Sequence, residues 1–205
     1  MSKSKKIYRK IIKDYSISSW AKLAKEAIIH CYDYFPLNTG NFWVEGDSET
    51  GGKNYRAEVS CLSKQNETVG VISRVYAGKK LVSTTEKVYV KSIDGLREYK
   101  KLIPGSKDYN LVLRYPLIVG KSWAVRPDSD EMTCIIETKD AVVETKAGKF
   151  TNCLKIRLNK KGIFDSWRFD YYAPEIGKIL TATGSVRSSA EHRISELINY
   201  RIIEE

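Results

Sequence analysis

From residue 42 onward, apolar and polar side chains alternate along the chain. The alternation is clearest over residues 55–61 and recurs over residues 69–76, 87–91 and 194–202. This pattern is typical of strands that have one buried and one solvated face. Short turn-forming sequences separate the strands, so the sequence indicates an antiparallel meander. We predict a mainly β protein with a single curved antiparallel sheet or half-barrel of about ten or eleven strands.

A helical pattern precedes the strands. Ser18 is suited to cap a helix, and apolar residues then recur at helical spacing from Trp20 to Cys31. We therefore predict one N-terminal amphipathic helix over residues 19–33 that packs its apolar face against the sheet. Pro36 then prevents the helix from continuing.

The chain contains one internal echo. Residues 34–43 and 114–123 both include the sequence aromatic-Pro-Leu-x-x-Gly-x-x-Trp. A proline and a glycine at this spacing suit a turn that leads into a strand. We expect two similar halves, residues 34–113 and 114–205, within one antiparallel β domain over residues 34–205.

Three segments in order resemble a known bacterial family. They are residues 115–123, 143–156 and 171–179, and they are similar to segments of the TapB-like domain of unknown function, which is common in exported proteins and lipoproteins. The resemblance covers residues 34–203. It implies a curved antiparallel sheet similar to lipoprotein-carrier domains, whose concave face can hold apolar ligands. It implies no catalytic residue, and residues 1–33 lack the signal or lipid-attachment segment common in the family.

Positive charge is concentrated near the N-terminus. Residues 1–33 hold eight basic and three acidic residues, which is half of the net charge of +10. Such a basic arm is suited to an anionic lipid, an acidic protein or nucleic acid, and the simpler interpretation is a solvated terminus. We do not expect nucleic acid, because so short a run carries no sequence-specific signal. The candidate partner-binding residues are Lys5, Lys6, Arg9 and Lys10.

The cysteines and the lack of long apolar runs indicate the cellular compartment of the protein. The four cysteines are too widely spaced for a zinc site, and their apolar neighbours predict free, buried thiols in a reducing compartment. No apolar run approaches the ~20 residues needed to cross a bilayer. Lys13 and Asp14 interrupt what would be the apolar stretch of a signal peptide. We expect a cytoplasmic protein, or a cell-envelope protein if Met1 is not the natural start.

No group of residues predicts catalysis. The two histidines, His30 and His192, are not spaced to activate a nucleophile. The acidic runs at residues 45–49 and 128–131 match no calcium-loop spacing and are typical of exposed loops. We therefore expect no catalytic residue, no metal and no cofactor.

The one unusual feature of the composition is the aromatic residues: the chain has 13 Tyr, 5 Phe and 4 Trp. Three of them share one face of a predicted strand: Trp167, Phe169 and Tyr171. The stripe is suited to the wall of an apolar pocket in the concavity of the sheet, and it is our candidate ligand-binding site. The alternative is that these rings form the core between the sheet and the helix.

Taken together, the sequence favours a non-enzymatic binding domain that carries or senses an apolar small molecule or lipid in its concave face. The alternative is an assembly module that docks onto a protein complex through residues 1–33. An enzyme of unknown class comes third. A carrier is expected to keep an open cavity, whereas an assembly module is expected to fill it.

Overall fold

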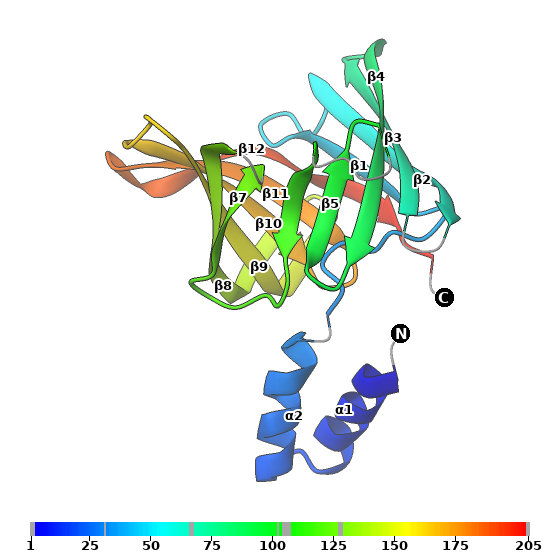
Figure 1. The fold of residues 1–205 in the computed structure, drawn as a ribbon, viewed down its shortest axis with the longest axis vertical. Helices are drawn as coiled ribbons and strands as arrows, with labels where there is room; N and C mark the ends of the chain where they lie inside the picture. The colour runs from blue at the N-terminus through cyan, green and yellow to red at the C-terminus, as the bar shows by residue number, and fades with distance from the viewer. Residues whose placement is uncertain are drawn as a thin grey trace.

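The computed structural model describes residues 3–30, 32–65, 68–101, 103, 108–126 and 129–203. Two helices come first and the strands follow (Figure 1). The helices are α1 (Lys3–Asp14) and α2 (Ser19–His30). The strands of the first half are β1 (Phe42–Asp47), β2 (Tyr55–Gln65), β3 (Thr68–Ala77), β4 (Lys80–Ser92), β5 (Gly95–Tyr99) and β6 (Asn110–Arg114). The strands of the second half are β7 (Ser122–Arg126), β8 (Ser129–Thr145), β9 (Gly148–Lys160), β10 (Ser166–Ala173), β11 (Gly177–Ser185) and β12 (Ser188–Arg201).

The twelve strands of the described residues form one antiparallel sheet. Their order is β6-β5-β4-β3-β2-β1-β12-β11-β10-β9-β8-β7, so each half is a meander and the halves meet where β1 pairs with β12. The predicted curved antiparallel sheet is confirmed, with slightly more strands than expected. The three strands nearest the middle of the chain, β5 to β7, have five residues each, which is too short to show a clear period of two.

The sheet curls until its two edge strands, β6 and β7, lie close together at what we call the seam. Side chains bridge the seam. The indole Nε1 of Trp123 on β7 donates a hydrogen bond of 2.9 Å to the carbonyl oxygen of Leu111 on β6. A longer contact of 3.5 Å joins Arg126 Nε to the Asn110 side-chain oxygen. The result is a nearly closed barrel in which the backbone ladder of the described strands ends at the seam.

The period-two pattern separates the inside of this barrel from its outside. On β2, Ala57 and Val59 line the interior cavity, while Arg56 and Glu58 form an ion pair of 3.1 Å on the other face. Side chains such as that of Leu154 are completely buried. Full burial of a leucine contributes about 1.5–3 kcal/mol, so the inward-facing set supplies most of the driving force for closure.

The two echo segments have the same local structure. Gly40 and Gly120 both adopt positive φ angles, of 87° and 83°. The Gly40 amide donates to the Cys61 carbonyl at 3.0 Å, and the Gly120 amide donates to the Ile136 carbonyl at 2.8 Å. Each segment leads into the first strand of its half, β1 or β7.

The predicted helix is present as α2, and its predicted cap is confirmed. The Ser18 hydroxyl oxygen accepts a hydrogen bond of 3.1 Å from the Ala21 amide. The expectation that this helix packs against the sheet is wrong. Ala21 and Ala24 are buried among the described side chains of α2, which packs against α1. Figure 1 shows the helical pair set apart from the sheet.

The helix α1 was not predicted, because half of its twelve residues are basic and the segment reads as a charged arm. Its apolar residues nevertheless recur at helical spacing, as Ile7, Ile11 and Ile12 show. Neither helix of the described chain is long and apolar enough to cross a bilayer.

Candidate functional site

The barrel contains a cavity of about 550 Å³, which is a size typical of small-molecule sites. Strands of both halves contribute to its lining. The apolar part of the wall includes Val59, Val71, Leu111, Val125, Ile156 and Leu158. The sequence predicted a pocket inside the curved sheet, and the structure contains a cavity there. Its lining holds more charged residues than the sequence suggested.

The floor of the cavity is aromatic. The ring of Phe35 lies between Tyr89 of β4 and Tyr172 of β10, with ring centres 5.2 and 6.3 Å away. Trp43 at the start of β1 also lines the cavity, and its Nε1 donates a hydrogen bond of 2.6 Å to the Ile176 carbonyl. Burial raises the pKa of Tyr89 and of Tyr172 well above the ordinary value, so both hydroxyls stay protonated. The floor thus offers uncharged aromatic surface.

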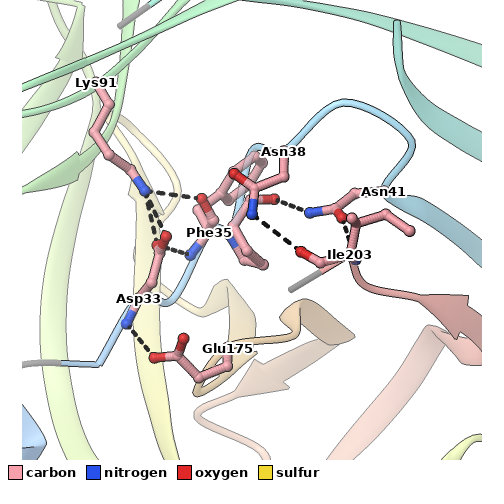
Figure 2. Close-up of polar contacts among 8 residues, drawn as sticks. Asp33, Phe35, Asn38, Asn41, Lys91, Glu175 and Ile203 are labelled. Atoms are coloured by element: carbon pink, nitrogen blue, oxygen red, sulfur yellow. Dashed lines mark hydrogen bonds and ion pairs between the residues drawn. The ribbon is translucent and has the colours of Figure 1, made fainter. Parts of the chain in front are cut away.

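Phe35 belongs to a segment that crosses this end of the barrel, residues 33–41, which we call the plug segment. Figure 2 shows the hydrogen bonds and the ion pair of Asp33, the first residue of the plug segment. The Asp33 carboxylate accepts hydrogen bonds of 2.8 and 2.7 Å from Lys91 Nζ on β4. The Asp33 amide donates to Glu175 Oε1 at 2.8 Å, and the Glu175 amide donates back to the Asp33 carbonyl at 2.7 Å. One residue is therefore tied to both halves of the barrel.

The other end of the plug segment is anchored to the end of the chain (Figure 2). Asn41 is completely buried, and its side chain donates to the Pro36 carbonyl at 3.1 Å and accepts from the Ile203 amide at 2.8 Å. Asn38 donates to the Ile203 carbonyl at 3.1 Å. A buried amide that satisfies both its donor and its acceptor fixes the backbone around it.

Three ion pairs also line the cavity. In the first, Asp170 of β10 is 2.8 Å from Arg168 on the same strand. The Asp170 carboxylate also accepts a hydrogen bond of 3.1 Å from the Thr181 hydroxyl on β11. These contacts compensate for the nearly complete burial of the carboxylate.

The second pair joins Glu98 of β5 to Lys87 of β4 at 2.9 Å. Glu98 also accepts hydrogen bonds from the Tyr89 hydroxyl at 2.6 Å and from the Asn110 amide group at 3.2 Å. Burial works to raise the pKa of Glu98, but the hydrogen bonds from Tyr89 and Lys87 outweigh it and the pKa lies below its ordinary value. Glu98 is therefore a charged group.

The third pair joins Glu45 of β1 to Lys178 of β11 at 3.4 Å. The negative charge of Glu45 raises the pKa of Lys178 above its ordinary value, in spite of burial. Because β1 and β11 both flank β12, this pair spans the junction between the two halves. We call the three pairs together the inner ion pairs.

The cation of each inner ion pair is more exposed than its carboxylate. The side-chain exposures are 48% against 7% for Arg168 and Asp170, 37% against 16% for Lys87 and Glu98, and 31% against 20% for Lys178 and Glu45. In each inner ion pair the cation is therefore the more accessible member. Such an arrangement suits an anionic group, which can accept charge-assisted hydrogen bonds without displacing the carboxylates.

The structure places the predicted aromatic stripe outside the set that lines this cavity. Trp167, Phe169 and Tyr171 lie on the other face of β10, next to side chains of the outer surface. Lys155 of β9 lies 3.9 Å from the centre of the Phe169 ring. Gly184 of β11 leaves space for the two rings at 167 and 169, because a Cβ there would overlap them. The three rings are packed beneath Lys155 and Arg157, and Trp167 also lines a separate cavity of about 210 Å³.

The inward-facing residues of the same strand were not predicted. Arg168, Asp170 and Tyr172 line the cavity. One feature of the sequence could have identified them: Arg168 and Asp170 have opposite charges and stand two residues apart on a strand that is otherwise mostly aromatic. Phe35 was also missed, because it lies in a segment that carries no strand or helix pattern.

The predicted partner-binding residues lie on α1. Lys10 is exposed. The side chains of Lys5, Lys6 and Arg9 lie outside the described residues. The prediction that these residues bind a partner is not tested by the fold.

The described cysteines are free and buried, as expected. Burial raises the pKa of Cys61 and of Cys134 to about 12, and that of Cys153 to about 11, so their thiols are unreactive. Cys31 lies outside the described residues. The described part of the chain contains no group of three side chains placed to hold a metal ion. His192 is exposed, away from the lining of the cavity.

Comparison with solved structures identifies the class of fold. The chain aligns over 83% of its length with all of a Bacteroides fragilis protein described as exported and as having a YmcC-like fold, with a TM-score of 0.53 and 13% identity. A Parabacteroides distasonis protein described as a lipoprotein aligns over 83% of this chain and 99% of its own, with a TM-score of 0.46 and 12% identity. Sequence comparison with protein-family models and with curated proteins finds no match. The chain therefore shares the fold of the Bacteroides fragilis protein, and this similarity shows the fold alone.

Proposed function

We propose that this chain is a non-enzymatic binding domain that takes a small anionic amphiphile into the cavity of its barrel. The observation that carries the proposal is the polarity of the inner ion pairs, whose cations are all more exposed than their carboxylates. An incoming carboxylate, sulfate or phosphate would accept hydrogen bonds from Lys87, Arg168 and Lys178. The apolar part of the ligand would lie against the aromatic floor.

The sequence suggested an apolar ligand, and the charged lining restricts this class to molecules that also carry a charged group. A wholly apolar molecule would remove water from the three ion pairs and offer no hydrogen bonds in return, which is unfavourable. A ligand with one charged end and one apolar part avoids this cost. The cavity volume of about 550 Å³ limits the ligand to a small amphiphile.

The protonation states of Glu98 and Cys134 in the cavity favour binding over catalysis. A general acid needs a carboxyl group that is protonated near neutral pH, whereas the pKa of Glu98 lies below its ordinary value. A thiol nucleophile needs a lowered pKa, whereas burial raises that of Cys134 to about 12. Both groups therefore suit a fixed lining better than a reaction.

We propose the cell envelope, rather than the cytoplasm, as the place where the domain works. The proposal is supported by the fold shared with a protein described as exported. It is also supported by residues 115–123, 143–156 and 171–179, which resemble segments of TapB-like domains. Secretion of the natural gene product into a periplasmic or surface fraction is the expected result of cell fractionation.

The binding proposal is tested with ligands that share one apolar chain and differ in the charged end. Calorimetry should show binding of laurate and lauryl phosphate, and much weaker binding of lauryl alcohol. Arg168→Gln should weaken the binding of lauryl phosphate by roughly tenfold, which is the effect of losing one charge-assisted hydrogen bond. The matched control is Arg157→Gln, because Arg157 lies on the outer face of β9 and pairs with Glu137.

Three results bear on the outcome. Equal binding of the alcohol and the anions would contradict the role of the cations. Equal loss in the two arginine variants would show that the effect does not come from the cavity. Native mass spectrometry before and after organic extraction adds an independent reading, since a retained amphiphile is expected as a defined extra mass.

A further inference from the structure

The two helices expose large apolar side chains that the fold leaves uncovered. We call α1, α2 and the turn between them the helical hairpin. Five of its apolar residues each have more than half of their surface exposed: Ile7, Tyr15, Ile17, Trp20 and Leu23. Single exposed apolar residues are common on protein surfaces, but five within one small unit indicate a surface that something covers.

The same hairpin carries strong positive charge. Helix α1 contains six basic residues and one acidic residue, which is the last of the helix. Among the described side chains, Lys10, Lys13 and Lys22 are exposed. Cationic and apolar groups are thus present together, on helices that pack mainly against each other.

We propose that the helical hairpin docks onto a membrane surface that contains anionic lipid. A helix that is rich in lysine and arginine on one side and apolar on the other lies in the interface of a bilayer. Tryptophan and tyrosine favour the headgroup level, where Trp20 and Tyr15 would be placed. Each basic residue near an anionic surface adds about 1 kcal/mol of attraction.

Charge complementarity alone would also fit nucleic acid, but the apolar residues favour lipid. A polyphosphate could pair with Lys10 and Lys13, yet it would leave Ile17, Trp20 and Leu23 in water. The interface of a bilayer offers anionic headgroups and apolar chains within the depth of one helix. Both kinds of side chain then find a partner at once.

The docked hairpin would orient the barrel. Helix α2 ends at His30, and the plug segment begins only three residues later, at Asp33. The plug segment closes the aromatic end of the cavity, so the hairpin is attached at the closed end. The docked hairpin would therefore place the plug segment, with Phe35, on the membrane side of the barrel.

The test uses the full chain and vesicles of defined composition. Co-sedimentation should show binding to vesicles of phosphatidylcholine mixed with phosphatidylglycerol, weaker binding to phosphatidylcholine alone, and release at high salt. Lys10→Glu combined with Lys13→Glu should weaken binding by roughly tenfold or more. Trp20→Ser combined with Leu23→Ser should also weaken it, because these variants remove the buried apolar area. Circular dichroism confirms that each variant remains folded.

Matched controls come from the barrel. Phe164→Ser with Val186→Ser removes two apolar side chains that are similarly exposed, and Lys79→Glu with Lys80→Glu reverses two exposed charges. Both controls should bind vesicles as the parent chain does. Equal losses in hairpin and barrel variants would overturn the proposal.

Tryptophan fluorescence provides a second readout. Trp43 and Trp123 are buried and Trp167 is half-buried, so soluble quenchers act mainly on Trp20. Anionic vesicles should protect Trp20 from the quencher and shift its emission to shorter wavelength. An unprotected Trp20 in the presence of vesicles would contradict the proposal. Retention on heparin that is unaffected by the Trp20 and Leu23 substitutions, without vesicle binding, would assign the hairpin to nucleic acid instead.

Discussion

Trp43 and Trp123, at equivalent positions of the two echo segments, each donate a hydrogen bond from the indole Nε1 to a backbone carbonyl outside their own strand. The indole Nε1 of Trp43 donates to the Ile176 carbonyl at 2.6 Å, and that of Trp123 donates to the Leu111 carbonyl at 2.9 Å. Each tryptophan lies in the first strand of its half. The first bond ties β1 to the turn between β10 and β11, and the second ties β7 to β6 across the seam. The internal echo of the sequence therefore places one indole donor at the seam and the other at the turn between β10 and β11.

Trp123→Phe should open the seam without unfolding the barrel. The variant keeps most of the ring volume but leaves the Leu111 carbonyl without the indole donor, which costs about 1–3 kcal/mol. Urea unfolding measures this loss, and hydrogen exchange should accelerate most in β6 and β7. A uniform acceleration over all strands would show that the indole does not act at the seam.

Lys91→Met should loosen the plug segment. The variant removes the partner of the Asp33 carboxylate, and the partly exposed pair is expected to contribute about 1 kcal/mol. Amide exchange over residues 33–41 should rise. The matched control is Lys155→Met, which breaks contacts to Glu137 and Glu191 on the outer face and should leave exchange in the plug segment unchanged.

Asp47 should give the folded state a pH dependence in the acid range. Hydrogen bonds from the Thr50 hydroxyl and amide and from the Tyr55 amide lower the pKa of Asp47 from 3.8 to about 2. Because the pKa is lowered on folding, the carboxylate stabilises the fold fully above pH 3.8, and this contribution is lost as the pH falls towards about 2. Asp47→Asn should flatten the dependence of the unfolding free energy on pH in this window. An NMR titration of Asp47 with a midpoint near 3.8 would contradict the assignment.

Gly184→Ala should destabilise the barrel through the aromatic stripe. A Cβ at position 184 would overlap Trp167 Nε1 and lie 2.8 Å from Phe169 Cε2. Overpacking of this kind costs about 1–3 kcal/mol, measured as a lower midpoint of thermal or urea unfolding. Gly70→Ala is the matched strand control, because its Cβ would meet Ser63 Oγ at an ordinary 3.4 Å. Equal effects of the two substitutions would show that strand propensity, rather than ring packing, decides the cost.

The sheet could be predicted because its signal is local. Alternation over residues 55–61 requires only that one face be apolar, and the structure puts Ala57 and Val59 in the cavity lining as that pattern demands. The echo could also be read, because a glycine with positive φ such as Gly40 or Gly120 is needed wherever the same turn recurs.

The candidate site could not be predicted, because it depends on which face of a strand points inward. On β10 both faces hold large side chains, and the aromatic one was taken as the inner face. The closure of the sheet instead places Arg168 and Asp170 inside and leaves Trp167 and Phe169 beneath outer side chains. The pairing of Asp170 with Thr181 and Arg168 compensates for the burial of this carboxylate, and these contacts are not visible in the sequence.

The course of the helices could be predicted only in part. The cap at Ser18 identified the start of α2, since capping is decided by neighbouring residues. The partner of α2 could not be identified, because the charge of α1 concealed its helical period. A helix with alanines such as Ala21 and Ala24 on its buried face is suited to close approach by another helix, and that was the unused signal.

The plug segment connects the two proposed binding regions of the chain, the helical hairpin and the cavity. At one end it continues into the helical hairpin, and a few residues later Phe35 forms part of the cavity floor. A ligand that displaces Phe35 would strain the contacts of Asp33, which lies next to the hairpin. By thermodynamic reciprocity, whatever factor an occupied barrel applies to membrane affinity, the membrane applies to ligand affinity. If the barrel binds a ligand and the hairpin binds a membrane, as proposed, the nine residues 33–41 are the segment through which each event would affect the other.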